Sequence, residues 1–142
     1  MYLDTDIILA LIKEEDWLKD YVKLSEFKPA KTSAITMIEV RLVLLREYSR
    51  KKALESLSKI KKLKVEIIPI DTLILEKSQL LLEKYSNLGI FDSIHAATAI
   101  KINEKLVGTD SVFNDIDEVE NIDPRKFSNK IEDDNCSNID SI

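Results

Sequence analysis

The sequence predicts an α/β fold of three layers, with helices on both faces of a central parallel sheet of four to five strands. Its 142 residues suit one domain with a sizeable core. Hydrophobic residues make up 44% of the chain and charged residues 33%, a balance typical of globular proteins. Short β-compatible segments alternate with helical ones, and this order favours a parallel sheet that is covered on both faces.

The first half of the chain is expected to contain two strands and four helices. Residues 1–4 form a short strand, and the apolar run that follows at 7–12 is helical. Residues 16–24 carry apolar side chains at helical spacing, and Pro29 closes that element. Residues 32–35 are β-compatible. The remaining expectations are a strongly helical stretch over 36–50 and a second helix to about residue 61.

The second half completes the sheet. Residues 65–68 form a strand, and Asp71 is placed to cap a helix that runs to about residue 87. A further helix is expected over 91–102, a fourth strand over 105–108 and a short fifth strand within 118–122. We therefore expect one domain over 1–127. The tail at 128–142 holds one lysine and four acidic residues, a net charge of −3, and is predicted to be flexible.

The rarest residues exclude most kinds of catalytic site. The chain has two glycines (Gly89 and Gly108), one histidine (His95) and one cysteine (Cys136). Phosphate-binding and dinucleotide-binding loops need clustered glycines, and Cys/His zinc sites need more ligands than this. A histidine-dependent nucleophile could use only His95. The 26 acidic residues leave oxygen ligands, and with them hard cations such as Mg²⁺ or Mn²⁺, as the available chemistry.

The N-terminal region carries no sign of a targeting segment. Acidic residues begin at Asp4, and the longest purely apolar run, 7–12, is far shorter than a membrane span. We expect a cytoplasmic protein that does not bind a membrane.

Four acidic residues fall where parallel α/β sheets carry their chemistry, at the carboxyl ends of the strands. Two follow predicted strands, and two lie in the first turns of predicted helices: Asp4, Asp110, Glu39 and Asp92. Carboxylates that converge at one edge repel one another unless cations neutralise them. The pattern therefore predicts a metal site there.

Three of these four residues also have a structural interpretation, whereas Asp4, a charge at the end of a central strand, is the hardest to explain without a partner. Thr36-x-x-Glu39 matches a capping box, and a carboxylate at Asp92 favours a helix N-terminus without any ligand. Asp110 lies in a Thr-Asp-Ser turn. Asp6 is expected to cap the helix that begins at residue 7, with a role as a metal ligand, or as a residue that positions one, as the alternative.

Three other features of the sequence bear on the site and its surroundings. His95 follows Asp92 by one turn, on a helix of small apolar residues, and is expected to be a hydrogen-bonded core histidine. Trp17 and Tyr21 favour core or partner surface over base stacking. Residues 41–64 hold nine basic and two acidic residues, a net charge of +7, which indicates either a solvated helix face or a surface for a phosphate backbone.

These motifs resemble the PIN-domain ribonucleases, especially the VapC-type toxins of bacteria and archaea. The resemblance covers residues 1 to about 125 and rests on five stretches: Tyr-Leu-Asp4-Thr-Asp6, Thr36-Met-Ile-Glu39, Phe91-Asp92-Ser-Ile-His95-Ala-Ala, Gly108-Thr-Asp110-Ser-Val-Phe113 and Val119-Glu-Asn-Ile-Asp-Pro124. It implies a three-layer PIN-like fold. It also implies that Asp4, Glu39, Asp92 and Asp110 are the metal-binding and catalytic acids, with Thr109 positioning the last of them. Departures at Asp6 and Asn114 leave the number of metals and the role of Asp115 open.

The activity implied by the resemblance is a Mg²⁺- or Mn²⁺-dependent endoribonuclease that leaves a 5′-phosphate and a 3′-hydroxyl. One metal would activate water and a second would stabilise the leaving oxygen. The implied partners are RNA, a cognate antitoxin and a second copy of the chain, with residues 7–24 as a candidate partner surface. A PIN nuclease for RNA processing without an antitoxin, and a non-catalytic RNA- or protein-binding module, remain alternatives. A haloacid-dehalogenase-like phosphatase, suggested by Asp4-Thr-Asp6, leaves Glu39 and Asp92 unexplained.

Overall fold

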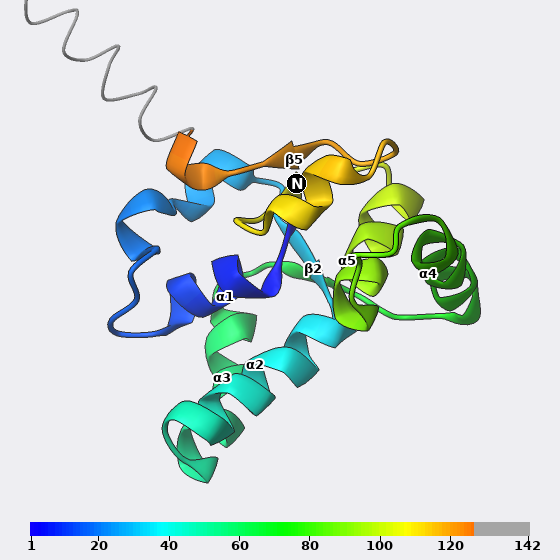
Figure 1. The fold of residues 1–142 in the computed structure, drawn as a ribbon. Coiled ribbons are helices and arrows are strands. Elements are labelled where there is room, and N and C mark those ends of the chain that lie inside the picture. Colours follow the sequence, from blue (N-terminus) through cyan, green and yellow to red (C-terminus); the bar gives the residue numbers. More distant parts are fainter. Residues whose placement is uncertain (127–142) are drawn as a thin grey trace, which may run out of the picture.

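Five short strands form one parallel sheet with the order β3-β2-β1-β4-β5 (Figure 1). The computed structural model describes residues 1–126. The strands are β1 (Tyr2–Leu3), β2 (Lys31–Ser33), β3 (Glu66–Ile68), β4 (Leu106–Val107) and β5 (Asn121–Ile122). The predicted parallel sheet is confirmed, and the first strand of the chain lies at its centre, between β2 and β4.

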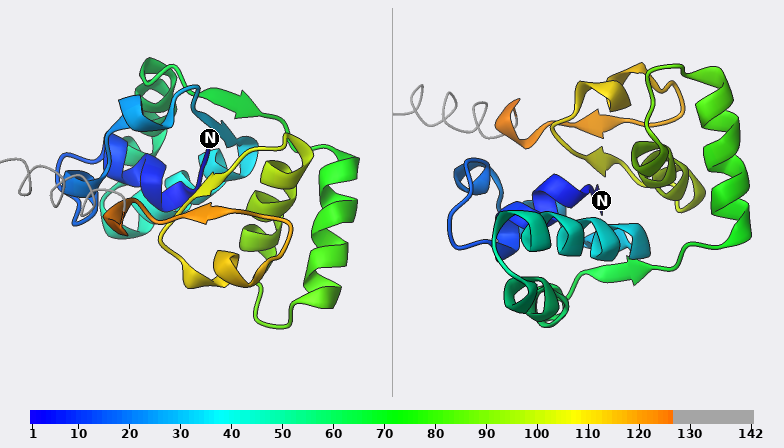
Figure 2. Two further views of the ribbon diagram at one scale, coloured as in Figure 1. Left: turned by 90° about the horizontal axis from the view of Figure 1, so that it is seen from above. Right: turned by 60° about the horizontal axis from the view of Figure 1, so that its bottom comes forward.

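Helices cover both faces of the sheet (Figure 2). The helices are α1 (Thr5–Ile12), α2 (Ala34–Glu47), α3 (Arg50–Lys62), α4 (Thr72–Lys84) and α5 (Ile90–Lys101). Successive side chains of a strand point to opposite faces, so Leu3 enters the core formed with α1, α2 and α3, whereas Tyr2 enters the core formed with α4 and α5. These two cores make the three-layer arrangement that the sequence predicts.

Residues 16–24 do not form the predicted α-helix. The structure has two 3₁₀ helices in this region, η1 (Lys19–Tyr21) and η2 (Leu24–Phe27). The side chain of Asp16 accepts a hydrogen bond from the backbone N–H of Leu18 at 2.9 Å, which is a local turn that competes with helix formation. Trp17 at the start of the segment is 64% exposed and therefore does not belong to the core.

Two helices begin earlier than predicted, and this changes the roles of three residues. Helix α1 begins at Thr5, and its cap is Asp4, not Asp6. Helix α2 begins at Ala34 after Ser33, so Thr36 is an interior helical residue and the predicted capping box with Glu39 is wrong. The cap at Asp71 is confirmed, since its side chain accepts a hydrogen bond from the N–H of Ile74 at 2.9 Å.

No helix within residues 1–126 is long and apolar enough to cross a membrane. The predicted acidic tail at 128–142, which includes Cys136, lies outside the described residues. The boundary between the domain at 1–127 and the tail at 128–142 therefore remains a prediction.

Candidate active site

Asp4 follows the central strand β1 directly and begins the site. Its Oδ1 accepts a hydrogen bond from the N–H of Thr5 at 2.8 Å. Gly108, just after the neighbouring strand β4, packs closely against it: a Cβ atom at position 108 would lie 3.2 Å from Asp4 Cβ and 3.3 Å from Asp4 Oδ2. One of the two glycines of the chain therefore gives the Asp4 carboxylate its space at the strand ends.

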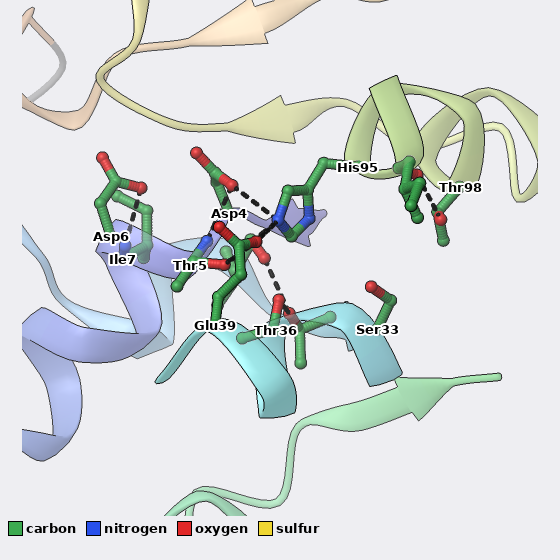
Figure 3. Close-up of polar contacts among 12 residues, drawn as sticks. Asp4, Thr5, Asp6, Ile7, Ser33, Thr36, Glu39, His95 and Thr98 are labelled. Carbon is green, nitrogen blue, oxygen red and sulfur yellow. Dashed lines mark hydrogen bonds and ion pairs between the residues drawn. The ribbon is translucent and has the colours of Figure 1, made fainter. Parts of the chain in front are cut away.

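His95 lies between two of the predicted acidic residues (Figure 3). It is fully buried on α5, and its Nε2 is 2.5 Å from Oε1 of Glu39 on α2 and 3.3 Å from Oδ1 of Asp4. The hydroxyl of Thr5 donates to the same Glu39 oxygen at 2.9 Å. The expectation of a buried, hydrogen-bonded histidine is confirmed, but this histidine joins two of the acids rather than packing apart from them.

The second ring nitrogen of His95, Nδ1, contacts a buried residue of the core. His95 Nδ1 is 2.6 Å from the hydroxyl of Tyr2, which in turn is 2.7 Å from Oγ of Ser33. Burial raises the pKa of Tyr2, so its phenol stays protonated. We assign the protonated imidazolium, in which Nε2–H donates to Glu39 and Nδ1–H donates to Tyr2, whose own proton goes to Ser33.

The charges around the ring agree with that assignment. Burial by itself would lower the pKa of His95, but the hydrogen bond with Glu39 and the negative charges of Asp4, Glu39 and Asp92 outweigh burial and raise it. The imidazolium therefore neutralises part of the negative charge of the acidic residues around it.

Burial and neighbouring negative charges raise the pKa values of two of the carboxyl groups, Asp4 and Asp92. Burial raises the pKa of Asp4 to about 7; the positive charge of His95 opposes this rise, while Asp6 and Asp92 add to it. Burial and the charge of Asp110 raise the pKa of Asp92 in the same way. Asp92 is half-buried, and its carboxylate makes no hydrogen bond or ion pair with the other described residues.

Asp6 and Asp110 lie at the outer side of this group. Asp6 Oδ2 accepts hydrogen bonds from the backbone N–H of Thr109, at 3.1 Å, and from the Thr109 hydroxyl. Thr109 thus links the loop after β4 to α1. Asp110 is exposed, and its side chain caps the short helix η3 (Ser111–Asp115) by accepting from the N–H of Val112 at 3.0 Å. Its charge reaches Asp92, so all four predicted acids belong to one electrostatic group.

The donor chemistry fits a hard divalent cation, because the group offers carboxylate oxygens that raise one another's pKa values and one of them, Asp92, has no partner among the described residues. Within residues 1–126, no three His, Cys, Asp or Glu side chains are already arranged around a common point that could hold a metal. Glu39 and Asp4 are instead hydrogen-bonded or paired with His95. A cation would thus compete with the imidazolium for these two carboxylates.

Three contributors to the site escaped the sequence-based prediction: the linking role of His95, the Thr5 hydroxyl and the Tyr2 phenol. The signals were weak. His95 stands three residues after Asp92 on the buried side of a helix, and Thr5 and Tyr2 flank Asp4 in the first motif. Nothing in the spacing shows that Glu39 and His95, which are 56 positions apart, meet.

A parallel α/β sheet with acidic side chains gathered at its strand ends defines a class of proteins with an acidic, oxygen-donor site. Comparison with known families specifies the class. The PIN domain family model matches residues 1–119, and the chain therefore belongs to the PIN domain family. The predicted resemblance is confirmed, and the phosphatase alternative is left without support.

Solved structures of similar fold include a toxin–antitoxin complex from Klebsiella pneumoniae, with 25% identity and a TM-score of 0.63, and FitAcB from Neisseria gonorrhoeae, with 25% identity and a TM-score of 0.64. Each match covers 87% of this chain and 96% of the other. VapC20 of Mycobacterium tuberculosis, a toxin that cleaves the sarcin-ricin loop, has 18% identity and a TM-score of 0.67 over 78% of this chain and 89% of its own; at that identity the likeness shows the fold alone. A search of curated proteins gives no match.

Proposed function

We propose that this protein is a Mg²⁺- or Mn²⁺-dependent endoribonuclease and the toxin of a VapBC-type pair. The observation that carries the proposal is the buried link Asp4–His95–Glu39 at the strand ends of a PIN domain, with Asp92 and Asp110 in the same electrostatic group. Like the enzymes of its family, it would hydrolyse phosphodiester bonds of RNA.

Asp4, Asp92 and Asp110 are the residues that would hold one divalent cation, and Glu39 would contribute to a second. When bound, such a cation supplies Lewis acidity to water and to the phosphate. The chain's own residues do the positioning. His95 and Thr5 both hold Oε1 of Glu39 by hydrogen bonds, and Gly108 leaves the space that the Asp4 carboxylate occupies. Thr109 holds Asp6 at the outer side.

Metal binding is expected to raise the melting temperature more at pH 8 than at pH 6. Burial raises the pKa of Asp4 to about 7, so a proton on this carboxyl group competes with a cation at pH 6 and has largely left at pH 8. Thermal unfolding in Mg²⁺ or Mn²⁺ measures the shift, with KCl of equal ionic strength as the control for screening. An equal shift at both pH values would contradict competition between metal and protons.

The RNA backbone would contact the hairpin of α2 and α3. Eight of its nine basic side chains between Arg41 and Lys64 are exposed. Exposed cations of this kind attract phosphates and make binding depend on salt. The hairpin begins at the site itself, since Glu39 lies on α2, so RNA held there passes near the acidic residues.

A cognate antitoxin would bind the apolar side of the same hairpin. Most apolar side chains within 7–24 are buried in the core, so that segment offers less partner surface than predicted. The exposed apolar groove instead lies between α2 and α3, has a volume of about 280 Å³, and is lined by Ile38, Leu42, Leu45, Ala53, Leu54, Arg41 and Arg50. Two arginines beside apolar side chains suit an amphipathic helix with acidic flanks. The toxin–antitoxin complexes of similar fold support such a partner.

Other exposed apolar side chains are available for a homodimer. They lie on α4 and at the start of α5: Leu73, Leu75, Leu80, Ile90 and Phe91. A second copy of the chain is the occupant we propose for this surface.

The test of the proposed function is RNA cleavage by the purified protein with Mg²⁺, with Mn²⁺ and with a chelator. Cleavage is expected only with metal. Asp92→Asn is expected to lower the rate at least about 100-fold, as the loss of one group that stabilises the transition state typically does. The matched control is Asp117→Asn, which changes an exposed carboxylate outside the acidic group. Cleavage by Asp92→Asn at the wild-type rate would overturn the proposal; RNA binding without cleavage by the wild type would favour the non-catalytic module.

A further inference from the structure

Trp17, the only tryptophan of the chain, is an exposed indole in the loop between α1 and η1. Its side chain is 64% exposed. The neighbouring aromatic residue, Tyr21, is by contrast partly buried against the core. Trp17 therefore does not contribute to the interior, and its indole ring is available for a contact at the surface.

Arg125 lies over the ring of Trp17. Its guanidinium carbon is 5.6 Å from the ring centroid, within the range of a cation–π interaction. Asp123 holds the guanidinium in place, because Nε donates to Asp123 Oδ1 at 3.0 Å and Nη2 donates to Oδ2 at 2.6 Å. The hydrogen bonds that the Arg125 guanidinium donates within residues 1–126 come from Nε and Nη2, so Nη1 keeps its N–H groups for a ligand.

The Trp17–Arg125 pair is joined to the rim of the acidic site. Arg125 Nη2 donates to the backbone carbonyl of Thr109 at 3.4 Å, and the Thr109 N–H donates to Asp6 at 3.1 Å. Asp6 is close enough to raise the pKa of Asp4. In Figure 1 the orange segment that ends the described chain and the blue region after α1 lie on the same side of the molecule. This side is opposite to the one that carries α4 and α5.

We propose that Trp17 and Arg125 bind one nucleotide of single-stranded RNA next to the scissile phosphodiester, with the base stacked on the indole and a phosphate paired with the guanidinium. This proposal rests on the proposed ribonuclease function. Aromatic rings bind unpaired bases by stacking, and arginine pairs with phosphate through its planar fork. A negatively charged site repels the RNA backbone, and a fixed cation at its rim offsets that repulsion. An exposed ring for a base beside a guanidinium for a phosphate favours RNA over an acidic or apolar peptide, neither of which offers both groups.

The fluorescence of the protein tests the contact directly, because its only indole is Trp17. In the presence of a chelator, a single-stranded oligoribonucleotide of about ten residues is expected to quench the emission. An oligomer of the same length with abasic positions keeps the phosphates but is expected to quench weakly. Equal quenching by both would show that the ring does not stack on bases and would overturn the proposal.

Cleavage kinetics with metal supply the second measurement. Trp17→Ala is expected to raise KM about 10-fold with kcat little changed, the effect of one lost stacking contact, and Trp17→Phe is expected to recover most of the affinity. The matched control is Tyr85→Ala, since Lys84 Nζ lies 5.2 Å from the centroid of the Tyr85 ring, but Tyr85 follows the C-terminal end of α4, outside the hairpin of α2 and α3. An unchanged KM in Trp17→Ala, with normal cleavage, would overturn the proposed nucleotide-binding role of Trp17 and Arg125 while the ribonuclease function stands. Quenching without cleavage by the wild type would support nucleotide binding by Trp17 and Arg125 and overturn the proposed ribonuclease function.

Discussion

Asp4→Asn is expected to lose RNA cleavage and, in the absence of metal, to be more stable than the wild type at neutral pH. Activity falls because the variant lacks the carboxylate that we place at the centre of the site. Stability rises because Asp4 is buried with a pKa of about 7, well above its ordinary value of 3.8. The folded protein thus keeps a proton that the unfolded chain releases, and an uncharged amide does not pay this cost.

The sign of the pH dependence follows from the same shift. A carboxyl group whose pKa is raised by folding destabilises the folded state progressively as pH rises from about 4 to about 7. Wild type should lose stability over that interval, and Asp4→Asn should lose less. At pH 8 we expect the variant to be more stable by about 2 kcal/mol.

Denaturant unfolding in a chelator at pH 5 and pH 8, together with RNA cleavage in Mg²⁺, measures both effects. Asp117→Asn again serves as the control, because its carboxylate is exposed and lies outside the acidic group. If Asp4→Asn were inactive but also less stable at pH 8, its inactivity could be loss of fold, and the assigned cost of the buried carboxylate would be wrong.

His95→Ala is expected to lower the free energy of unfolding by about 3–5 kcal/mol, because it removes a buried partner from charged groups. Glu39 would lose its 2.5 Å contact, the Tyr2 hydroxyl would lose a partner, and Asp4 would lose a neighbouring positive charge. The substitution also leaves a cavity where the ring is fully buried.

Urea unfolding of His95→Ala, with and without Mn²⁺, tests this role. His95→Gln is the conservative comparison, since its amide can donate to one of the two partners but not to both, and it should lie between alanine and wild type. Added Mn²⁺ should recover part of the stability, because it replaces the lost positive charge between the carboxylates. A loss below about 1 kcal/mol for alanine would mean that the histidine carries no charge in the folded protein.

Local patterns predicted the elements that depend on local interactions. The strand before Asp4, the cap at Asp71 and the helix around Asp92 all follow from neighbouring residues, and the structure has them. The prediction of an α-helix over 16–24 was wrong because the helical spacing of apolar residues did not outweigh the turn that the Asp16 side chain makes. The prediction of a capping box at Thr36 was wrong because the helix already begins at Ala34, two residues earlier.

The acidic group could be predicted because parallel topology brings strand ends together whatever the details of packing. The partners of each acid could not. His95 reaches Glu39 because α5 and α2 contact each other, and such a contact depends on the whole fold rather than on spacing in the chain. For the same reason, the sequence favoured core or partner surface for Trp17 and gave no sign that Arg125, more than a hundred residues later, would lie on its ring.

The pairing of β1 with β4 sets when the site can exist. Tyr2 is matched with Leu106, so the centre of the sheet joins the beginning of the chain to a segment synthesised about a hundred residues later. Contacts this far apart in sequence form late in folding, after the loop between them has been ordered. Asp92 and Asp110 belong to that late half, so a nascent chain carries Asp4 and Glu39 without the rest of the acidic group. The activity proposed for this protein is therefore expected only after β4 and Asp110 have been synthesised and have packed beside β1, which leaves an earlier interval in which the proposed antitoxin can bind.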